Sequence, residues 1–81
     1  MKKVYVDVNA DHHSIDGSVV PKIITWEDGQ QYEVDRIVDI RKAASLKAGG
    51  IGTRYTILIL GKQTYIWLED DGIRWFVEGK S

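Results

Sequence analysis

The chain contains no cysteine, only one proline and no long hydrophobic run. Without cysteine, neither a disulfide bond nor a thiolate–zinc site is available to stabilise the fold. A membrane-spanning helix needs roughly 20 consecutive apolar residues, and the apolar stretch near Met1 is too short and too polar for a signal peptide. We therefore expect a cytoplasmic protein, without a membrane partner, that is held together by its own hydrophobic core.

A strong excess of charge of either sign is also missing. The 11 basic and 12 acidic side chains give a formal net charge of −1. Nucleic-acid-binding domains are often strongly basic. The overall charge therefore argues against a nucleic-acid partner, unless basic residues cluster locally.

The length of 81 residues suffices for one domain, spanning 1–81, with a single core. Hydrophobic residues make up 43% of the chain, among them three Trp, four Tyr and one Phe. Because each aromatic side chain buries roughly 150–250 Å², these eight residues supply much of the core.

Period-two alternation of apolar residues predicts short strands. They lie at 3–9, 22–27, 30–40, 55–60, 63–69 and 73–78. The pair Asp28-Gly29 is typical of a hairpin turn, and pairing across it should bring Trp26 near Tyr32. Short connections and apolar residues on both faces of three strands favour a closed antiparallel sheet. The sequence thus predicts an all-β fold, a small SH3-like antiparallel β-barrel or roll of five to six strands.

The run 30–40 departs from simple alternation. Arg36 shares its parity with the apolar Val34 and Val38, whereas Ile37 shares its parity with Asp35. Either Arg36 points inward to a carboxylate, or a β-bulge near Asp35-Arg36 resets the register and turns Ile37 inward. We favour the bulge, because strongly bent strands are how small barrels close.

Evidence for catalysis or metal binding is weak. Asp11, His12, His13 and Asp16 lie in a polar segment after the first strand. Adjacent histidines on a strand point to opposite faces, so we interpret the segment as a solvated loop. No phosphate-binding or dinucleotide-binding glycine motif is present. We expect no catalytic residue, no metal site and no cofactor, and hence a protein that is not an enzyme.

The segment 42–53 is the best candidate for a binding surface, and we expect a loop that can hold one helical turn. With its flanks it carries four basic residues and no acidic one, and its glycines would let backbone N–H groups approach an anion. The competing interpretation is a solvated loop whose arginines pair with Asp35 or Asp39. The candidate binding residues are Arg41, Lys42, Lys47, Gly49, Gly50, Gly52, Arg54 and Tyr55.

The aromatic residues suggest an alternative function. A core this small cannot hold all of them centrally, so one or two should lie on the surface, where they can stack on bases or bind a peptide. The residues in question are Tyr32, Tyr55, Tyr65, Trp67 and Phe76. The alternative is a protein–protein interaction module that binds an extended peptide at an aromatic groove or a strand edge.

Two stretches carry a resemblance to known proteins: 21–56, which runs from Pro21 through WEDG and AASLKAGG to RYT, and RWFVE at 74–78. In them the chain resembles a family of short uncharacterised bacterial proteins, found mainly in Gram-positive lineages. The resemblance covers nearly the whole chain beyond the segment 9–18. The spacing of its aromatic residues is more loosely similar to that of small domains encoded beside Y-family DNA polymerases. The resemblance implies an accessory role in DNA repair, with nucleic acid or a DNA-repair protein as partner, and it implies no site residues.

Overall fold

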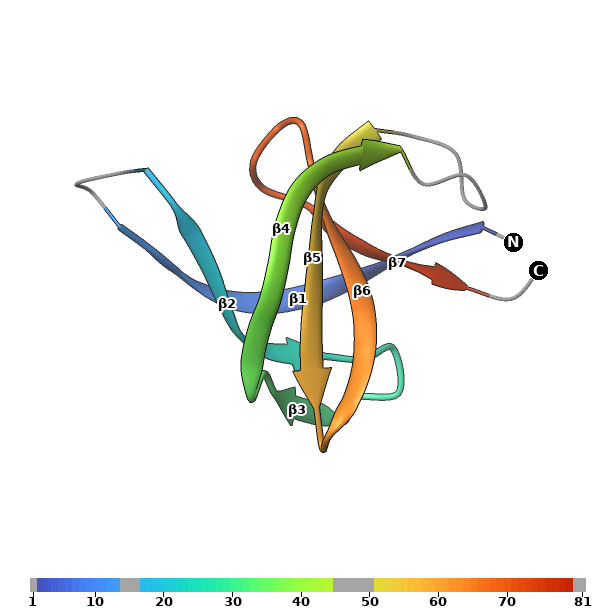
Figure 1. Ribbon diagram of the computed structural model, residues 1–81. Coiled ribbons are helices and arrows are strands. Elements are labelled where there is room, and N and C mark those ends of the chain that lie inside the picture. The colour runs from blue at the N-terminus through green and yellow to red at the C-terminus, as the bar shows by residue number, and fades with distance from the viewer. Residues whose placement is uncertain (1, 14–16, 45–50, 80–81) are drawn as a thin grey trace.

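The computed structural model describes residues 2–13, 17–44 and 51–79, which form a single antiparallel sheet (Figure 1). These described residues contain no helix, and therefore none that could cross a membrane. The strands are β1 (Lys2–His12), β2 (Val19–Thr25), β3 (Gln31–Glu33), β4 (Arg36–Ala44), β5 (Ile51–Ile59), β6 (Lys62–Glu69) and β7 (Trp75–Gly79). The expected all-β fold is thus confirmed.

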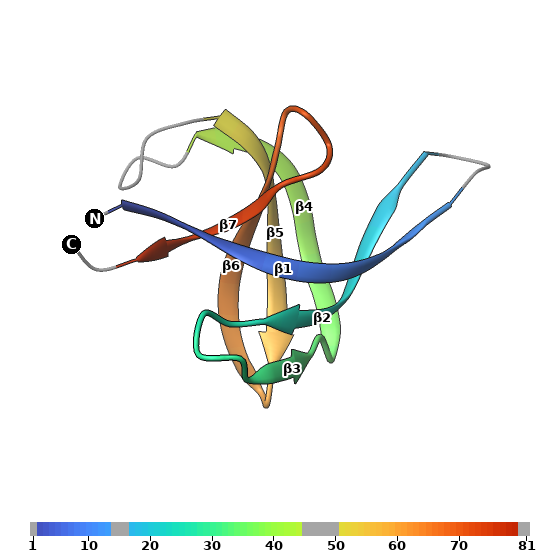
Figure 2. The ribbon, with the colours of Figure 1, turned by 180° about the vertical axis from the view of Figure 1, so that it is seen from behind.

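The strands follow the order β3-β2-β1-β7-β6-β5-β4, and the sheet curls into a half-barrel (Figures 1 and 2). Its two edge strands, β3 and β4, are consecutive in the chain. The backbone N–H of Val34 donates to the carbonyl of Lys22 at 2.9 Å, and that of Asp35 donates to the carbonyl of Leu58 at 2.8 Å. These two hydrogen bonds join the opposite ends of the sheet at one corner.

The same corner explains why the described residues form seven strands where the sequence predicted five or six. The predicted run 30–40 divides at Val34-Asp35, where the chain leaves β2 and joins β5. A register shift lies between Ile37 and Asp39, somewhat later than the predicted bulge. Ile37 packs against the core and Arg36 is exposed, as the favoured alternative expected. The break at Val34-Asp35, and not a bulge at Asp35-Arg36, turns Ile37 inward, because the register shift follows Ile37.

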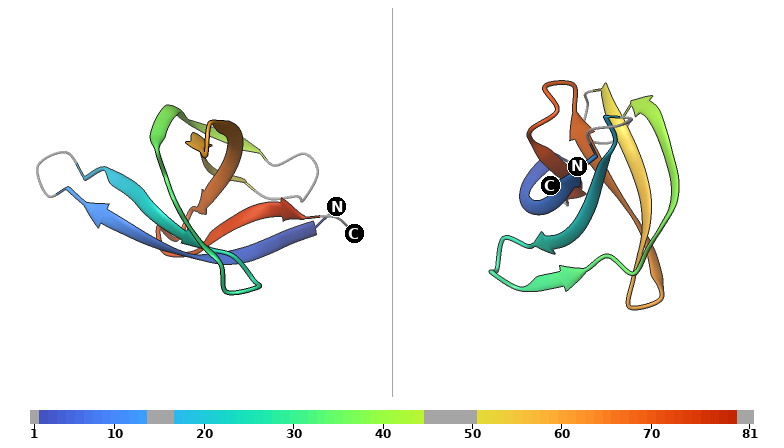
Figure 3. Two further views of the ribbon diagram at one scale, coloured as in Figure 1. Left: turned by 90° about the horizontal axis from the view of Figure 1, so that it is seen from below. Right: turned by 90° about the vertical axis from the view of Figure 1, so that its left-hand side faces the viewer.

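The second half of β1 and the start of β2 form a projecting arm (Figure 3). The sequence placed Asp11 and His12 in a loop, and this was wrong, because they pair with Val20 and Val19 of β2. Val19 lies at the outer end of the described arm, opposite His12, and its carbonyl accepts a hydrogen bond from the hydroxyl of Tyr55 at 2.7 Å. The arm is thereby attached to the body of the sheet.

One face of the sheet, here called the inner face, carries the core. Ile24, Ile57 and Ile66 are fully buried there. The core cluster consists of Val6, Ile24, Tyr55, Ile57, Ile66, Leu68, Trp75 and Val77. Trp26 packs against it and meets Tyr32 edge-on, with ring centroids 6.3 Å apart, as the hairpin pattern predicts.

The prediction of a loop over 42–53 was wrong at both ends. Lys42–Ala44 belongs to β4 and 51–53 to β5, with Lys42 opposite Thr53 and Ala43 opposite Gly52. Cross-strand pairing here outweighs the weak helical preference of a short alanine-containing segment. The remainder of the predicted loop and its helical turn, at 45–50, lie outside the described residues.

Candidate functional site

The predicted binding residues do not share one surface. Arg41 and Arg54 lie directly opposite each other on β4 and β5, whereas Tyr55 is buried in the core on the other face. Gly52 is also buried, against the backbone of β6. Lys42 is exposed on β4. Lys47, Gly49 and Gly50 lie outside the described residues.

The basic side chains that are described already have partners. Arg41 Nε lies 2.6 Å from Asp39 Oδ2, and Lys42 Nζ lies 3.6 Å from Asp70 Oδ1. The hydrogen bond from Arg41 lowers the pKa of Asp39. The guanidinium of Arg54 stands 4.8 Å from the ring centroid of Tyr65. Of the arginine pairings that the sequence suggested, the one between Arg41 and Asp39 is present.

These arginines end a row that crosses five strands on the outer face of the sheet. Register places Tyr5, Phe76, Trp67, Arg54 and Arg41 side by side, from β1 to β4. Trp67 stacks on Phe76, with centroids 5.5 Å apart and planes within 9°. Both rings are buried, whereas Tyr5 is exposed. Buried Nε of Arg54 and Nε1 of Trp67 have no hydrogen-bond partner.

An ionic cluster lies where β1 meets the β6–β7 turn. Glu69 Oε1 accepts from Lys3 Nζ and from the Tyr5 hydroxyl, both at 2.8 Å. Arg74 donates to Glu69 Oε2 at 3.1 Å and to Asp71 Oδ2 at 2.8 Å. The hydrogen bond from Lys3 is the main cause that lowers the pKa of Glu69. Both carboxylates are therefore held in the ionised form and serve to tie the chain together.

Within this cluster, the pKa of Asp71 departs furthest from its ordinary value. Its Oδ1 accepts backbone N–H groups from Ile73 at 2.8 Å and from Arg74 at 3.1 Å. The hydrogen bond from Ile73 is the largest cause that lowers the pKa of Asp71 to about 2, followed by that from the Arg74 side chain. This carboxylate shapes the turn before β7.

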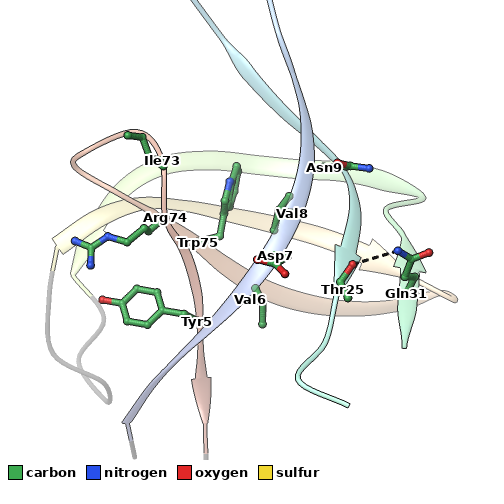
Figure 4. A pocket seen from close by; sticks show the side chains of 10 residues that line it. All are labelled: Tyr5, Val6, Asp7, Val8, Asn9, Thr25, Gln31, Ile73, Arg74 and Trp75. Carbon is green, nitrogen blue, oxygen red and sulfur yellow. Dashed lines mark hydrogen bonds between the residues drawn. The ribbon is translucent and has the colours of Figure 1, made fainter. Parts of the chain in front are cut away.

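A hollow of about 460 Å³ borders the cluster (Figure 4). Arg74 and Tyr5 lie at one end of it, Asp7 lies in the middle, and Thr25 and Gln31 lie at the other end. Gln31 Nε2 donates to Thr25 Oγ1 at 3.4 Å. The lining contains one carboxylate, on Asp7, and no second carboxylate or histidine.

A second hollow of about 390 Å³ lies between the β2–β3 hairpin and the β5–β6 hairpin. The β2–β3 hairpin and the tip of β5–β6 lie at the bottom of Figure 1. We call this hollow the aromatic groove. It is lined by Trp26, Tyr32, Ile59, Leu60, Lys62 and Thr64. The rings of Trp26 and Tyr32 stand at 85° to each other, and the hydroxyl of Tyr32 donates to Gln30 Oε1 at 2.7 Å. Most of this lining is apolar.

Leu60 is the unusual member of the groove. It forms the two-residue β5–β6 turn with Gly61, and both have positive φ, at 51° and 76°. A left-handed conformation costs a residue with a Cβ about 1–2 kcal/mol, and the side chain of Leu60 remains 79% exposed. The sequence interpretation missed Leu60 and Lys62, because it ended the strand at Leu60 and left 61–62 for the turn. In the structure the turn consists of Leu60 and Gly61, one residue earlier.

Metal-binding side chains do not gather among the described residues, where no group of three His, Asp or Glu could hold an ion. The chain matches no family model, no curated protein and no solved structure. Function is therefore inferred from the surfaces themselves, and the family resemblance noted in the sequence stays a prediction.

Proposed function

We propose that this protein is a non-catalytic interaction module of the bacterial cytoplasm, an SH3-like β-barrel that binds an extended peptide of a partner protein in the aromatic groove. The observation that supports the proposal is the position of the Leu60 side chain. A left-handed turn presents it to solvent beside Trp26 and Tyr32. Backbone strain of this kind is concentrated at active sites and ligand-binding sites.

The chemistry of the groove favours a mainly apolar, extended peptide. Grooves lined by aromatic side chains on small β-barrels bind extended or polyproline segments. The perpendicular rings of Trp26 and Tyr32 offer one flat face and one edge, against which an aliphatic or proline side chain can pack. Lys62 is the charged residue of the lining, so the peptide should carry a carboxylate near that position.

A random-sequence peptide library displayed on phage tests the proposal. The wild-type protein should enrich sequences with apolar residues and one acidic residue. Peptides made from them should shift the amide resonances of 24–34 and 59–64. Leu60→Asn should weaken this binding by tenfold or more, since tenfold corresponds to about 1.4 kcal/mol, and it should leave the protein folded.

Ile73→Asn provides the matched control. Ile73 is 77% exposed, nearly as much as Leu60, but it lies outside the aromatic groove. This variant should bind the selected peptides like the wild type. A library that yields no enriched sequence, or peptides whose shifts map to another face, would contradict the proposal.

A second candidate function is binding of single-stranded nucleic acid on the outer face, as part of a DNA-repair accessory role. The specific observation that favours it is the stack of Arg54 on the exposed ring of Tyr65, next to Arg41. Arginine and aromatic side chains together form the usual platform for unpaired bases. The ion pairs of Arg41 and Lys42 weigh against it.

A titration with short single- and double-stranded DNA distinguishes this candidate. Amide shifts at Arg41, Arg54 and Tyr65 that survive physiological salt would support it. Phosphate contacts alone should weaken by about 0.7–0.9 log units per contact for each log unit of salt. Shifts that vanish with modest salt would exclude specific recognition of DNA by this face.

A further inference from the structure

The outer edge of β4 is long and open. β4 ends the sheet, and no other described strand pairs with its free side. Its nine residues contain no proline and span about 30 Å at roughly 3.3 Å per residue. Two apolar side chains, Val38 and Ile40, are 50% and 48% exposed along it. An open edge of this kind is a template for pairing with another strand.

The charges along this edge are complementary to themselves. Asp39 and Arg41 flank Ile40, and they lie on the same face, where they form an ion pair at 2.6 Å. If two copies pair antiparallel with Ile40 opposite Ile40, then Asp39 of each copy faces Arg41 of the other. Opposite charges in directly opposed positions stabilise a sheet.

Other registers lack this complementarity. In an antiparallel pair, residues directly opposite each other point to the same face of the sheet. A two-fold axis perpendicular to the sheet leaves each face unchanged, so it must pass between the two copies of one residue. An axis at Asp39, Arg41 or Lys42 would oppose two like charges, which destabilises the pair. An axis at Val38 would place Ile37 opposite Asp39 and Arg36 opposite Ile40, so no unlike charges would meet within β4.

We infer that β4 pairs with β4 of a second copy of this chain, with Ile40 on the two-fold axis. The two sheets then continue across the interface. Asp39 and Arg41 of both copies alternate in a cluster of four charges on the outer face, and the two Ile40 side chains cover each other on the inner face. The register shift beside Val38 limits the regular ladder, so the dimer is weak and depends on protein concentration.

Charge exchange tests this pairing. In Asp39→Arg the new arginine faces Arg41 of the other copy, and in Arg41→Asp the new aspartate faces Asp39. Sedimentation velocity over about a hundred-fold range of protein concentration should show wild-type protein moving toward the mass of two chains, and each variant alone should stay monomeric. An equal mixture of the two variants should dimerise again, because unlike charges then face each other.

This mixing experiment separates pairing between chains from effects within one chain. Each variant has lost the ion pair within β4, so recovery in the mixture can come only from contacts between copies. Glu33→Arg on β3, an equal change of charge at the other edge of the sheet, is the control and should dimerise like the wild type. Ile40→Lys, which places two like charges across the axis, should be monomeric.

Two outcomes would overturn the inference: wild-type protein that remains monomeric at the highest concentration, or a mixture of Asp39→Arg and Arg41→Asp that remains monomeric while the wild type dimerises. Circular dichroism of every variant shows whether it is folded. The inference uses the β4 edge and none of the residues that line the aromatic groove, so it stands or fails separately from peptide binding.

Discussion

The backbone of Gly52 lies so close to the carbonyl group of Leu68 that a Cβ atom at position 52 would meet the carbonyl oxygen at 2.5 Å. The two residues belong to the paired strands β5 and β6. From its sequence context, Gly52 was expected in a loop that approaches an anion. In the structure, its missing side chain instead allows two strands to approach each other closely.

Gly52→Ala should therefore destabilise the protein. The added methyl group cannot fit unless the backbone of β6 shifts, and overpacking of this kind costs about 1–3 kcal/mol in the free energy of unfolding. Urea denaturation measures the change. Gly29→Ala is the comparison, because its Cβ would meet nothing within 4 Å and only the left-handed turn opposes it. An unchanged free energy of unfolding in Gly52→Ala would contradict the close approach.

Leu60→Asn should stabilise the protein while it weakens peptide binding. Asparagine tolerates the positive φ of this turn better than leucine, and relief of the strain should add about 0.5–1 kcal/mol to the free energy of unfolding. The thermal midpoint should rise. Leu60→Ala should show no such gain, because alanine tolerates positive φ no better than leucine does. A lower midpoint for Leu60→Asn would mean that the leucine stabilises the fold.

Tyr55→Phe should loosen the arm. The change removes the hydrogen bond to the carbonyl of Val19, and loss of one such bond at a buried residue costs about 0.5–1.5 kcal/mol. Hydrogen exchange of the amides at 9–12 and at 19, 20 and 22 should accelerate. Tyr32→Phe removes a hydroxyl whose hydrogen bond is exposed and should leave both stability and exchange nearly unchanged. Equal effects from the two changes would argue against the role of Tyr55 as the anchor.

Acid should remove the stabilisation that Asp71 provides. Its folded-state pKa, about 2, lies below the ordinary value of 3.8, so its ionised form favours the folded state. This contribution to the free energy of unfolding is complete at a pH above the ordinary pKa, and it is lost as the pH falls from the ordinary pKa toward 2. Unfolding by urea at a series of pH values should show the loss in the wild type. The loss should be smaller in Asp71→Asn and should persist in Asp70→Asn.

The sequence by itself determined the hairpins and the class of fold. Alternating apolar residues and the Asp28-Gly29 turn correctly predicted the contact between Trp26 and Tyr32, because these signals act between residues close in the chain. It did not reveal that the run 30–40 breaks into β3 and β4. That break depends on two hydrogen bonds, from Val34 to Lys22 and from Asp35 to Leu58. Leu58 lies more than twenty residues beyond Asp35 in the chain.

The placement of the candidate surfaces was decided only by the tertiary structure. Basic and aromatic residues near 41–55 were recognisable from composition, but their roles were not. Tyr55 lies in the core, Arg41 is paired with Asp39, and Leu60 stands exposed beside a groove built from two hairpins. Local sequence shows which side chains can bind. Which of them reach a surface depends on the neighbours that cover them, and distant strands supply those neighbours.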